Sequence, residues 1–305
     1  MRVLFILICA IFFYTNLNAQ EQIQFSQIHR VQALINPAYA SSRDDINAMV
    51  LYRNQWVGMS GTPVIQAFAF RYPSPRKRFA LGLTIKNNNW AFYNKSDVMV
   101  SYGYHVFFND SSSRLSFGIQ GGINFYTIRW NQIVVGKNNP DVVLENNFKP
   151  YSPNIGYGVF YNTKNFFSGF SVPEVFYKNS EGNEIAGSKF RFRNHHFYWY
   201  SGYVQDLGDY FKFKPTLLVK KVWGAPIQAD IMANLMFRNA LGIGVGYRSG
   251  DAFILMCEFN IRNLSLSYSF DYTLTELSTI SSNTHEIGLS YSFVKSYRNI
   301  SIRYF

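Results

Sequence analysis

The chain has 305 residues, of which 18% are aromatic and 15% are charged, and its formal net charge at pH 7 is +11. Beyond the first residues there is no run of about 20 consecutive apolar residues, which excludes membrane-spanning helices. An aromatic-rich chain whose mean hydropathy is close to zero suits a β-barrel in which half of each strand is polar.

Residues 1–19 predict an export signal. Arg2 supplies a positive charge, Val3–Phe13 is apolar, and Ala19 is a small residue suited to cleavage. Cleavage removes Cys9 and leaves Cys257 as the one cysteine, so neither an intrachain disulfide nor a cysteine-based metal site can form. In an exported chain the positive charge favours contacts with anionic lipid headgroups or a partner surface over nucleic acid, and a generic solvated basic surface is the simplest alternative.

Residues 20–45 show no strand alternation and contain the turn signal Asn36-Pro37, so we interpret them as a periplasmic lead-in segment. From residue 46 onward the sequence predicts fourteen strands, most of them long enough for a tilted membrane span of about 9–11 residues. The predicted strands are Ile46–Val57, Val64–Tyr72, Phe79–Lys86, Asp97–Phe108, Arg114–Trp130, Pro153–Asn162, Phe166–Val172, Phe190–Gln205, Tyr210–Lys220, Ile227–Phe237, Ala240–Ser249, Ala252–Ile261, Leu264–Tyr272 and Thr284–Phe293.

The strands predicted between residues 240 and 293 have the clearest pattern. Large aliphatic and aromatic residues occupy alternate positions, and the positions between them are mostly Gly and Ser in three of these strands. Successive side chains of a strand point to opposite faces, so each of these strands has one apolar face and one small or polar face. A membrane barrel turns such an apolar face toward lipid. We therefore predict an all-β fold, a transmembrane outer-membrane β-barrel built as an antiparallel meander of about fourteen strands over residues 46–293.

The connections between predicted strands alternate in length. Tight ones follow even-numbered strands, as at Arg238-Asn239, and long ones follow odd-numbered strands at Asn131–Tyr151, Pro173–Lys189 and Thr273–Asn283. Outer-membrane barrels have short periplasmic turns and longer outer loops, so this asymmetry predicts that both termini are periplasmic. Residues 294–305 are interpreted as a periplasmic tail, with an additional strand as the alternative.

No motif for catalysis or cofactor binding occurs. No histidine lies in a helical HExxH context, and no GxSxG elbow is present. The run Gly242–Gly246 has GxGxG spacing inside a strand pattern, without the helix that a nucleotide-binding loop precedes. We therefore assign no catalytic, cofactor-binding or metal-ligating residues and expect no enzyme. A Ser–His–Asp cluster assembled from different strands is the alternative that composition leaves open. The histidines are His29, His105, His195, His196 and His285.

Tryptophans and glycines give two further expectations. The tryptophans fall near predicted strand ends or in loops, which predicts an interfacial aromatic girdle, with sugar stacking as the alternative. Glycines on the inward faces leave space in the lumen, which suits either an open pore or a plug formed by residues 20–45. The residues concerned are Trp56, Trp90, Trp130, Trp199 and Trp223, and Gly118, Gly122, Gly156, Gly158, Gly242 and Gly244.

An ordered set of short motifs carries a family resemblance over nearly the whole mature chain. The motifs are Gln24–Gln27, Ile35–Ala40, Tyr52–Gly58, Gly61–Pro63, Leu115–Gly118, Pro153–Val159, Gly169–Pro173, His285–Ile287 and the ending Arg303–Phe305. In this order they resemble the PorP/SprF family of Bacteroidetes, outer-membrane proteins of the type IX secretion and gliding-motility machinery. One departure is local, because Ile28–Leu34 stands where relatives have a more apolar and aromatic stretch.

The resemblance implies a non-enzymatic barrel in the outer membrane of a Gram-negative, Bacteroidetes-like bacterium. Its implied partners are outer-membrane lipid, a large secreted adhesin with a C-terminal sorting domain, and the periplasmic ring proteins of the secretion machine. It also implies candidate residues for a shared structural or partner site: Asn36, Pro37, Tyr39, Arg53, Asn54, Gln55 and Trp56. A local interpretation is the alternative: Asn36-Pro37 forms a turn, Arg53 and Gln55 face the lumen, and Trp56 belongs to the aromatic girdle. The alternative function is a channel for small solutes, which the Gly- and Ser-lined faces favour.

Overall fold

The computed structural model describes residues 23–74, 78–108, 113–129, 149–178, 188–190, 195–223, 225–281 and 283–294. The predicted signal peptide at 1–19, Trp130 and all but the first residue of the predicted tail at 294–305 lie outside these ranges. Among the described residues, no helix is long and apolar enough to cross a membrane.

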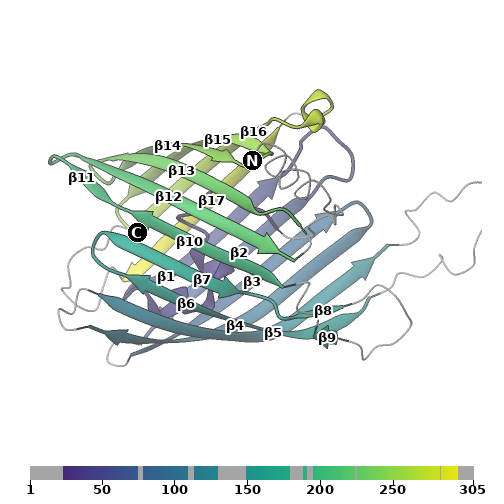
Figure 1. Cartoon of the computed structure of the whole chain (residues 1–305), viewed down its shortest axis with the longest axis horizontal. Helices are drawn as coiled ribbons and strands as arrows, with labels where there is room; N and C mark the ends of the chain where they lie inside the picture. The colour runs from purple at the N-terminus through teal and green to yellow at the C-terminus, as the bar shows by residue number, and fades with distance from the viewer. Residues whose placement is uncertain are drawn as a thin grey trace, which may run out of the picture.

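The described strands form a closed antiparallel barrel (Figure 1), which confirms the predicted fold class. Neighbours along the chain pair with each other, β1 pairs with β17, and β10 pairs with β12, so the sheet has no free edge. Because β10 and β11 pair in succession with β12, they count as one span, and the barrel has 14 strands. The bounds are β1 (Ile46–Asn54), β2 (Val64–Pro73), β3 (Phe79–Trp90), β4 (Tyr93–Phe107), β5 (Arg114–Ile128), β6 (Tyr151–Asn162), β7 (Phe166–Val172), β10 (His196–Tyr203), β11 (Gln205–Leu207), β12 (Phe211–Val222), β13 (Gln228–Phe237), β14 (Leu241–Arg248), β15 (Ala252–Ile261), β16 (Leu264–Thr273) and β17 (Thr284–Val294).

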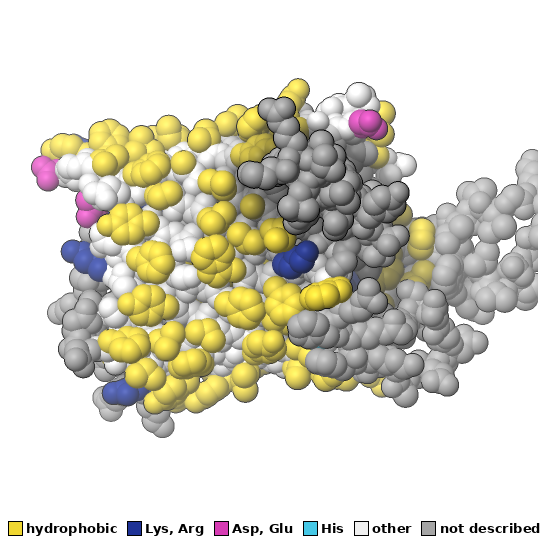
Figure 2. All heavy atoms as spheres, in the orientation of Figure 1, with side chains coloured by type: hydrophobic (Ala, Val, Ile, Leu, Met, Phe, Trp, Pro, Cys, Tyr) yellow, Lys and Arg dark blue, Asp and Glu magenta, His cyan; other side chains and the backbone are white. Residues whose placement is uncertain are grey.

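The outer wall of the barrel is apolar. In β14, Ile243 and Val245 point outward and are 58% and 59% exposed, whereas Gly242 and Gly244, which alternate with them, are buried. Hydrophobic side chains cover most of the wall visible in Figure 2, and charged side chains are few on it. In water such a surface would be a very large exposed apolar patch, so it is suited to contact with lipid.

The hairpin of β3 and β4 is longer than predicted. The sequence from residue 87 to residue 96 is rich in Asn and lacks apolar alternation, so it predicts a loop. In the structure polar side chains pair across the two strands instead, with Asn87 Nδ2 donating to Ser96 Oγ at 2.7 Å. The chain reverses at Ala91, whose φ of 45° provides a tight turn.

The strand predicted at Phe190–Gln205 begins too early. Residues 188–190 form β9 (Ser188–Phe190), which pairs with β8 (Phe176–Lys178) in a separate two-stranded sheet, and β10 starts only at His196. Aromatic residues occur in both segments, so composition alone could not separate them. The side chain of Asn154 on β6 attaches this hairpin to the barrel by bonding with the backbone N–H and carbonyl of Phe176.

The two ends of the barrel differ. Tight turns join the strands at one end, which we call the turn end, and there Arg238, Asn239 and Arg262 have the positive φ angles of two-residue hairpin loops. The long connections after β5, β7 and β16 lie at the other end, the loop end, together with β8, β9 and the 3₁₀ helix η5 (Glu276–Thr279). β1 begins and β17 ends at the turn end.

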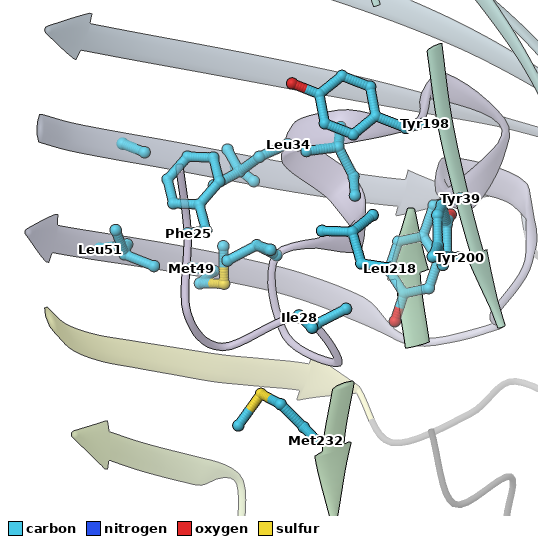
Figure 3. Close-up of a cluster of buried hydrophobic side chains, with 14 of the residues drawn as sticks. Phe25, Ile28, Leu34, Tyr39, Met49, Leu51, Tyr198, Tyr200, Leu218 and Met232 are labelled. Carbon is cyan, nitrogen blue, oxygen red and sulfur yellow. The ribbon is translucent and has the colours of Figure 1, made fainter. Parts of the chain in front are cut away.

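The lumen is occupied by residues 23–45, which we call the plug. The plug contains α2 (Gln32–Ile35) and the 3₁₀ helix η1 (Pro37–Ser41). Its apolar side chains, among them Phe25, Ile28 and Leu34, pack against inward-facing side chains of the wall, as Figure 3 shows. The main hydrophobic core therefore lies inside the barrel. The inner face is small or polar in strands such as β14, but it is apolar at Met49 and Leu51 of β1, where it meets the plug.

Candidate functional site

The candidate residues Asn36, Pro37 and Tyr39 lie in the plug. The Asn36 side chain caps η1 by accepting the backbone N–H of Ala38 at 2.9 Å, and its Nδ2 donates to the carbonyl oxygens of Val159 and Phe170 on β6 and β7. Pro37 occupies the first turn of η1, where its missing N–H costs nothing. Asn36 thus sets the start of a helix and attaches it to the wall.

Two inward-facing glycines make room for this attachment. A Cβ on Gly118 would overlap the backbone of Pro37 and Ala38, and a Cβ on Gly158 would overlap the Asn36 side chain. Backbone therefore packs on backbone where η1 crosses β5 and β6. The space that the inward glycines provide here is filled by the plug.

Tyr39 lies beside the same contact. Its ring meets the Phe160 ring edge-on with centroids 5.4 Å apart, and the Arg71 guanidinium lies 5.1 Å from the Tyr39 ring centroid. Phe160 in turn stacks on Phe167 and Tyr200, and all three wall side chains are almost fully buried. The end of the plug that leads into β1 is therefore held by aromatic packing as well as by hydrogen bonds.

A group of buried charges lines the lumen toward the loop end, and we call it the charge network. Its members alternate in sign along the chain of contacts and come from six strands: Arg53, Lys220, Asp230, Arg248, Asp271 and Glu286. Arg53, whose side chain is 1% exposed, lies 2.9 Å from Asp271 and 3.1 Å from Glu286. Arg248 joins Asp271 to Asp230, and Lys220 lies 3.1 Å from Asp230. Three cations and three carboxylates therefore pair with one another within the wall, and Arg248 also lies 3.5 Å from the less buried Asp251.

The plug begins on this network. The Glu286 carboxylate accepts the backbone N–H groups of Ser26 and Gln27 at 3.0 and 3.1 Å. The Ser26 hydroxyl donates to Asp271 at 2.6 Å and accepts from Arg53 at 2.7 Å. Arg248 also donates to the carbonyl of Phe25 at 2.8 Å. The plug contributes only neutral groups at this end of the lumen.

Toward the turn end, the plug and the wall instead neutralise each other's charge. Arg114 of β5 holds Asp44 with two hydrogen bonds of 2.7 and 2.8 Å, and its side chain is fully buried. Arg71 of β2 lies 2.6 Å from Asp45. Burial raises the pKa of Asp45, but Arg43 and Arg71 outweigh that effect and bring it to about 2.

A third contact of this kind joins the plug to β15. Glu258 accepts Arg30 at 3.0 Å and His29 at 3.1 Å. Burial lowers the pKa of His29 despite the neighbouring carboxylate, so His29 is neutral at pH 7 and Arg30 supplies the positive charge. Arg30 also donates to the Ser265 and Ser290 hydroxyls of β16 and β17.

A segment that follows β7 packs inside the lumen toward the loop end. Gln120 donates to the carbonyl of Pro173 at 2.7 Å, and a Cβ on Gly156 would overlap that carbonyl. Glu174 reaches Lys95 at 2.6 Å and Lys86 at 3.4 Å. Burial raises the pKa of Glu174, but Lys95 and Lys86 outweigh it and bring it to about 2. The plug and this segment together occupy the lumen at several levels.

The seven candidate residues fall into separate places. Asn36, Pro37 and Tyr39 lie together at the η1 contact, and Arg53 lies in the charge network. The remaining three continue from Arg53 to the loop end: Asn54 ends β1, Gln55 is buried beside Pro63, and Trp56 donates its backbone N–H to Thr284. Asp271, Arg248 and Asp230 were not found by sequence reasoning, because each is an isolated polar residue in an alternating strand.

The other residues considered for function are the tryptophans, possible metal ligands and Cys257. Of the described tryptophans, Trp199 and Trp223 are 44% and 58% exposed, and Trp90 lies at the tip of the β3–β4 hairpin. Within the described ranges, no group of three or more His, Cys, Asp or Glu side chains is placed to hold a metal ion. Cys257 is a free thiol on an outward-facing position of β15.

Comparisons with known proteins give one family match and several similar solved structures. The sequence model of a family described as "Type IX secretion system membrane protein PorP/SprF" matches residues 17–291. No curated protein matches the chain. Three similar solved structures are Omp33 of Acinetobacter baumannii, the toluene transporter TbuX of Ralstonia pickettii and a FadL homologue of Pseudomonas aeruginosa.

These structures share little sequence with the chain. Omp33 is 8% identical over 83% of this chain and 100% of its own, with a TM-score of 0.46. TbuX is 9% identical over 86% and 92%, with a TM-score of 0.49. The FadL homologue is 13% identical over 86% and 94%, with a TM-score of 0.44.

Proposed function

The chain belongs to the PorP/SprF family of type IX secretion system membrane proteins, and from this premise we propose that it is a non-enzymatic outer-membrane component of protein secretion and gliding motility. In this proposal it partners a large secreted adhesin, the periplasmic ring proteins of the secretion machine, or both. The family match over residues 17–291 is the observation that carries the proposal.

The state of the lumen supports a partner-binding role over a passive channel. A solute channel needs a continuous aqueous path, whereas here Ile28, Leu34 and Tyr39 of the plug pack against buried wall residues. The inward glycines that favour a channel in sequence are in part contact points for the plug, as at Gly118 and Gly158. Conductance of the purified barrel in planar bilayers distinguishes the two functions, because an occluded barrel is expected to be silent.

We further propose that the turn end faces the periplasm and the loop end faces the exterior. The short turns at one end and the long connections at the other support this orientation. Protease added to intact cells is expected to cut the loop-end segment after β7 and to spare the Arg238-Asn239 turn. Cleavage at the Arg238-Asn239 turn would show instead that the turn end faces the exterior.

We also propose that most of the seven candidate residues stabilise the barrel and its plug, and that only those at the loop end are placed to contact a partner. Asn36, Pro37, Tyr39 and Arg53 are buried and bonded within the lumen, which supports a role in fastening the plug. Asn54, Gln55 and Trp56 lie at the loop end, where a surface partner would arrive.

The decisive experiment is deletion of the gene in its native host, followed by two measurements. Surface display of the adhesin is followed by antibody labelling of intact cells, and secretion is followed by mass spectrometry of the medium. We expect loss of display of at least one adhesin or a general loss of secretion, restored by the wild-type gene. Normal display and secretion in the deletion strain would refute the proposal. Detergent pull-down of the tagged barrel then identifies the partner.

A further inference from the structure

The part of the lumen nearest the turn end has a cationic side that the plug does not neutralise. β12 directs Lys212 and Lys214 into the lumen, while Phe211 and Phe213 point outward and are 42% and 36% exposed. In the barrel register Lys212 lies opposite Met236 and Lys214 lies opposite Asn234 on β13. Both lysines are half-buried, and they are the second and fourth residues of β12, which begins at the turn end.

The plug adds further positive charge beside these lysines. Lys214 is close enough to Arg30, Arg43 and Glu258 for electrostatic interaction. The charges beside Lys214 within the lumen are the cations Arg30, Arg43 and Arg71 and the carboxylates Asp45 and Glu258. With Lys214 these are four cations and two carboxylates, an excess of two positive charges (4 − 2 = 2). By contrast, every member of the charge network toward the loop end has an oppositely charged partner.

A hydrogen-bond donor stands unused beside Lys214. The side chain of Asn234 is 4% exposed, and its Nδ2 has no hydrogen-bond partner among the described residues. Its Oδ1 lies against Gly244, so the amide projects into the lumen. A buried amide donor without an acceptor costs free energy, and a ligand that brings an acceptor would recover it.

We propose that the β12–β13 side of the lumen at the turn end binds a carboxylate-bearing peptide segment, which Lys214 and Asn234 contact directly. The ammonium of Lys214 supplies a charge-assisted hydrogen bond, and Asn234 Nδ2 supplies a second donor for the same carboxylate or for a neighbouring carbonyl. Arg30 and Lys212 add long-range attraction.

The occupant is a peptide rather than a lipid because of where the site lies. The sheet is closed by the pairing of β10 with β12 and of β1 with β17, so lipid on the outer wall has no lateral path to the lumen. The site lies near the turn end, so we expect a ligand to reach it from that end, which in the proposed orientation faces the periplasm. The inference rests on the proposed function only in placing the site in the periplasm. Binding of the peptide to the site can be measured on the isolated barrel.

The test measures binding of an octaglutamate peptide to the purified full-length barrel in neutral detergent, by isothermal titration calorimetry at low and high salt. We expect binding that weakens with salt, and a loss of about tenfold or more in affinity for Lys214→Met, which keeps the chain length but removes the charge. Lys164→Met is the matched control, because Lys164 is exposed in a turn-end loop outside the lumen. Lys214→Arg keeps the charge and is expected to retain binding.

The outcomes separate the site from general basicity. Equal weakening by Lys214→Met and Lys164→Met would overturn the proposal, as would binding of octaglutamine as tight as that of octaglutamate. Competition by inorganic phosphate at concentrations equal to those of the peptide would identify a simple anion site and also overturn it. Heat-modifiable migration on gels verifies that each variant is folded. Peptide binding together with normal secretion in the deletion strain would reject the proposed function while keeping the site.

Discussion

Replacement of Arg53 is predicted to destabilise the barrel strongly. The Arg53 side chain is 1% exposed and contacts Glu286, Asp271 and the Ser26 hydroxyl. Asp271 keeps Arg248 as a partner at 3.1 Å, but Glu286 would keep only the two backbone N–H groups of the plug. Removing one partner of a buried ion pair costs about 3–5 kcal/mol, because the remaining charge stays buried. We expect Arg53→Met to lower the free energy of unfolding by that amount.

The assay is urea unfolding of the barrel refolded into lipid vesicles, followed by tryptophan fluorescence. Arg78→Met is the matched control, because Arg78 is exposed at the turn end and its replacement is expected to change stability by no more than about 0.5 kcal/mol. The double variant Arg53→Met/Glu286→Gln is expected to be more stable than the sum of the single effects by about 0.5–3 kcal/mol, since neither charge is then left alone. An Arg53→Met barrel within about 1 kcal/mol of wild type would refute the reasoning.

Three further predictions follow from the plug. Gly118→Val is expected to displace η1 and lower the temperature at which the folded band disappears on gels, whereas Gly121→Val on the outward face, where an added Cβ meets only one atom at 4.0 Å, is not. The pKa of Asp45 is about 2 in the folded barrel against an ordinary 3.8, so its contribution to the free energy of unfolding is complete above about pH 4 and is lost as the pH falls through 2. Unfolding measured across this pH range is expected to show a loss of about 2 kcal/mol in the wild type, and this pH-dependent loss is expected to be absent from Asp45→Asn. Ile28→Ala, at a fully buried plug position, is expected to cost about 2–5 kcal/mol in urea unfolding, whereas Ile227→Ala, 62% exposed, costs far less.

The wall could be predicted from sequence because its signal is local. Alternation of apolar residues with Gly and Ser fixes which side chains of a strand face outward, and Phe166–Val172 was predicted with the bounds that β7 has. The prediction failed where strand pairing did not follow the alternation of apolar residues. The Asn-rich stretch after residue 86 pairs through polar side chains, and Phe190, which the sequence assigned to the strand of β10, belongs to β9.

The contents of the lumen could not be predicted in the same way. Gly118 and Gly158 indicated space, but a glycine does not say whether water or backbone fills it. The contact between Ser26 and Glu286 joins residues 260 positions apart, and no sequence period links them. Arg53 was selected by family resemblance, while its partner Asp271 remained one polar residue in an alternating strand.

The distribution of charge decides which part of the plug can move. If the plug left at the turn end, Glu258, Arg71 and Arg114 of the wall would remain buried without their partners, at a cost of several kcal/mol for each ion. At the loop end every member of the charge network has an oppositely charged partner in the wall, and Phe25, Ser26 and Gln27 contribute hydrogen bonds to it, each worth about 0.5–3 kcal/mol. Release of residues 23–27 therefore leaves no ion of the network without an ionic partner, unlike release of Arg30, Asp44 and Asp45. We expect any opening of this lumen to start at the loop end, with the turn-end half of the plug kept in place by its ion pairs.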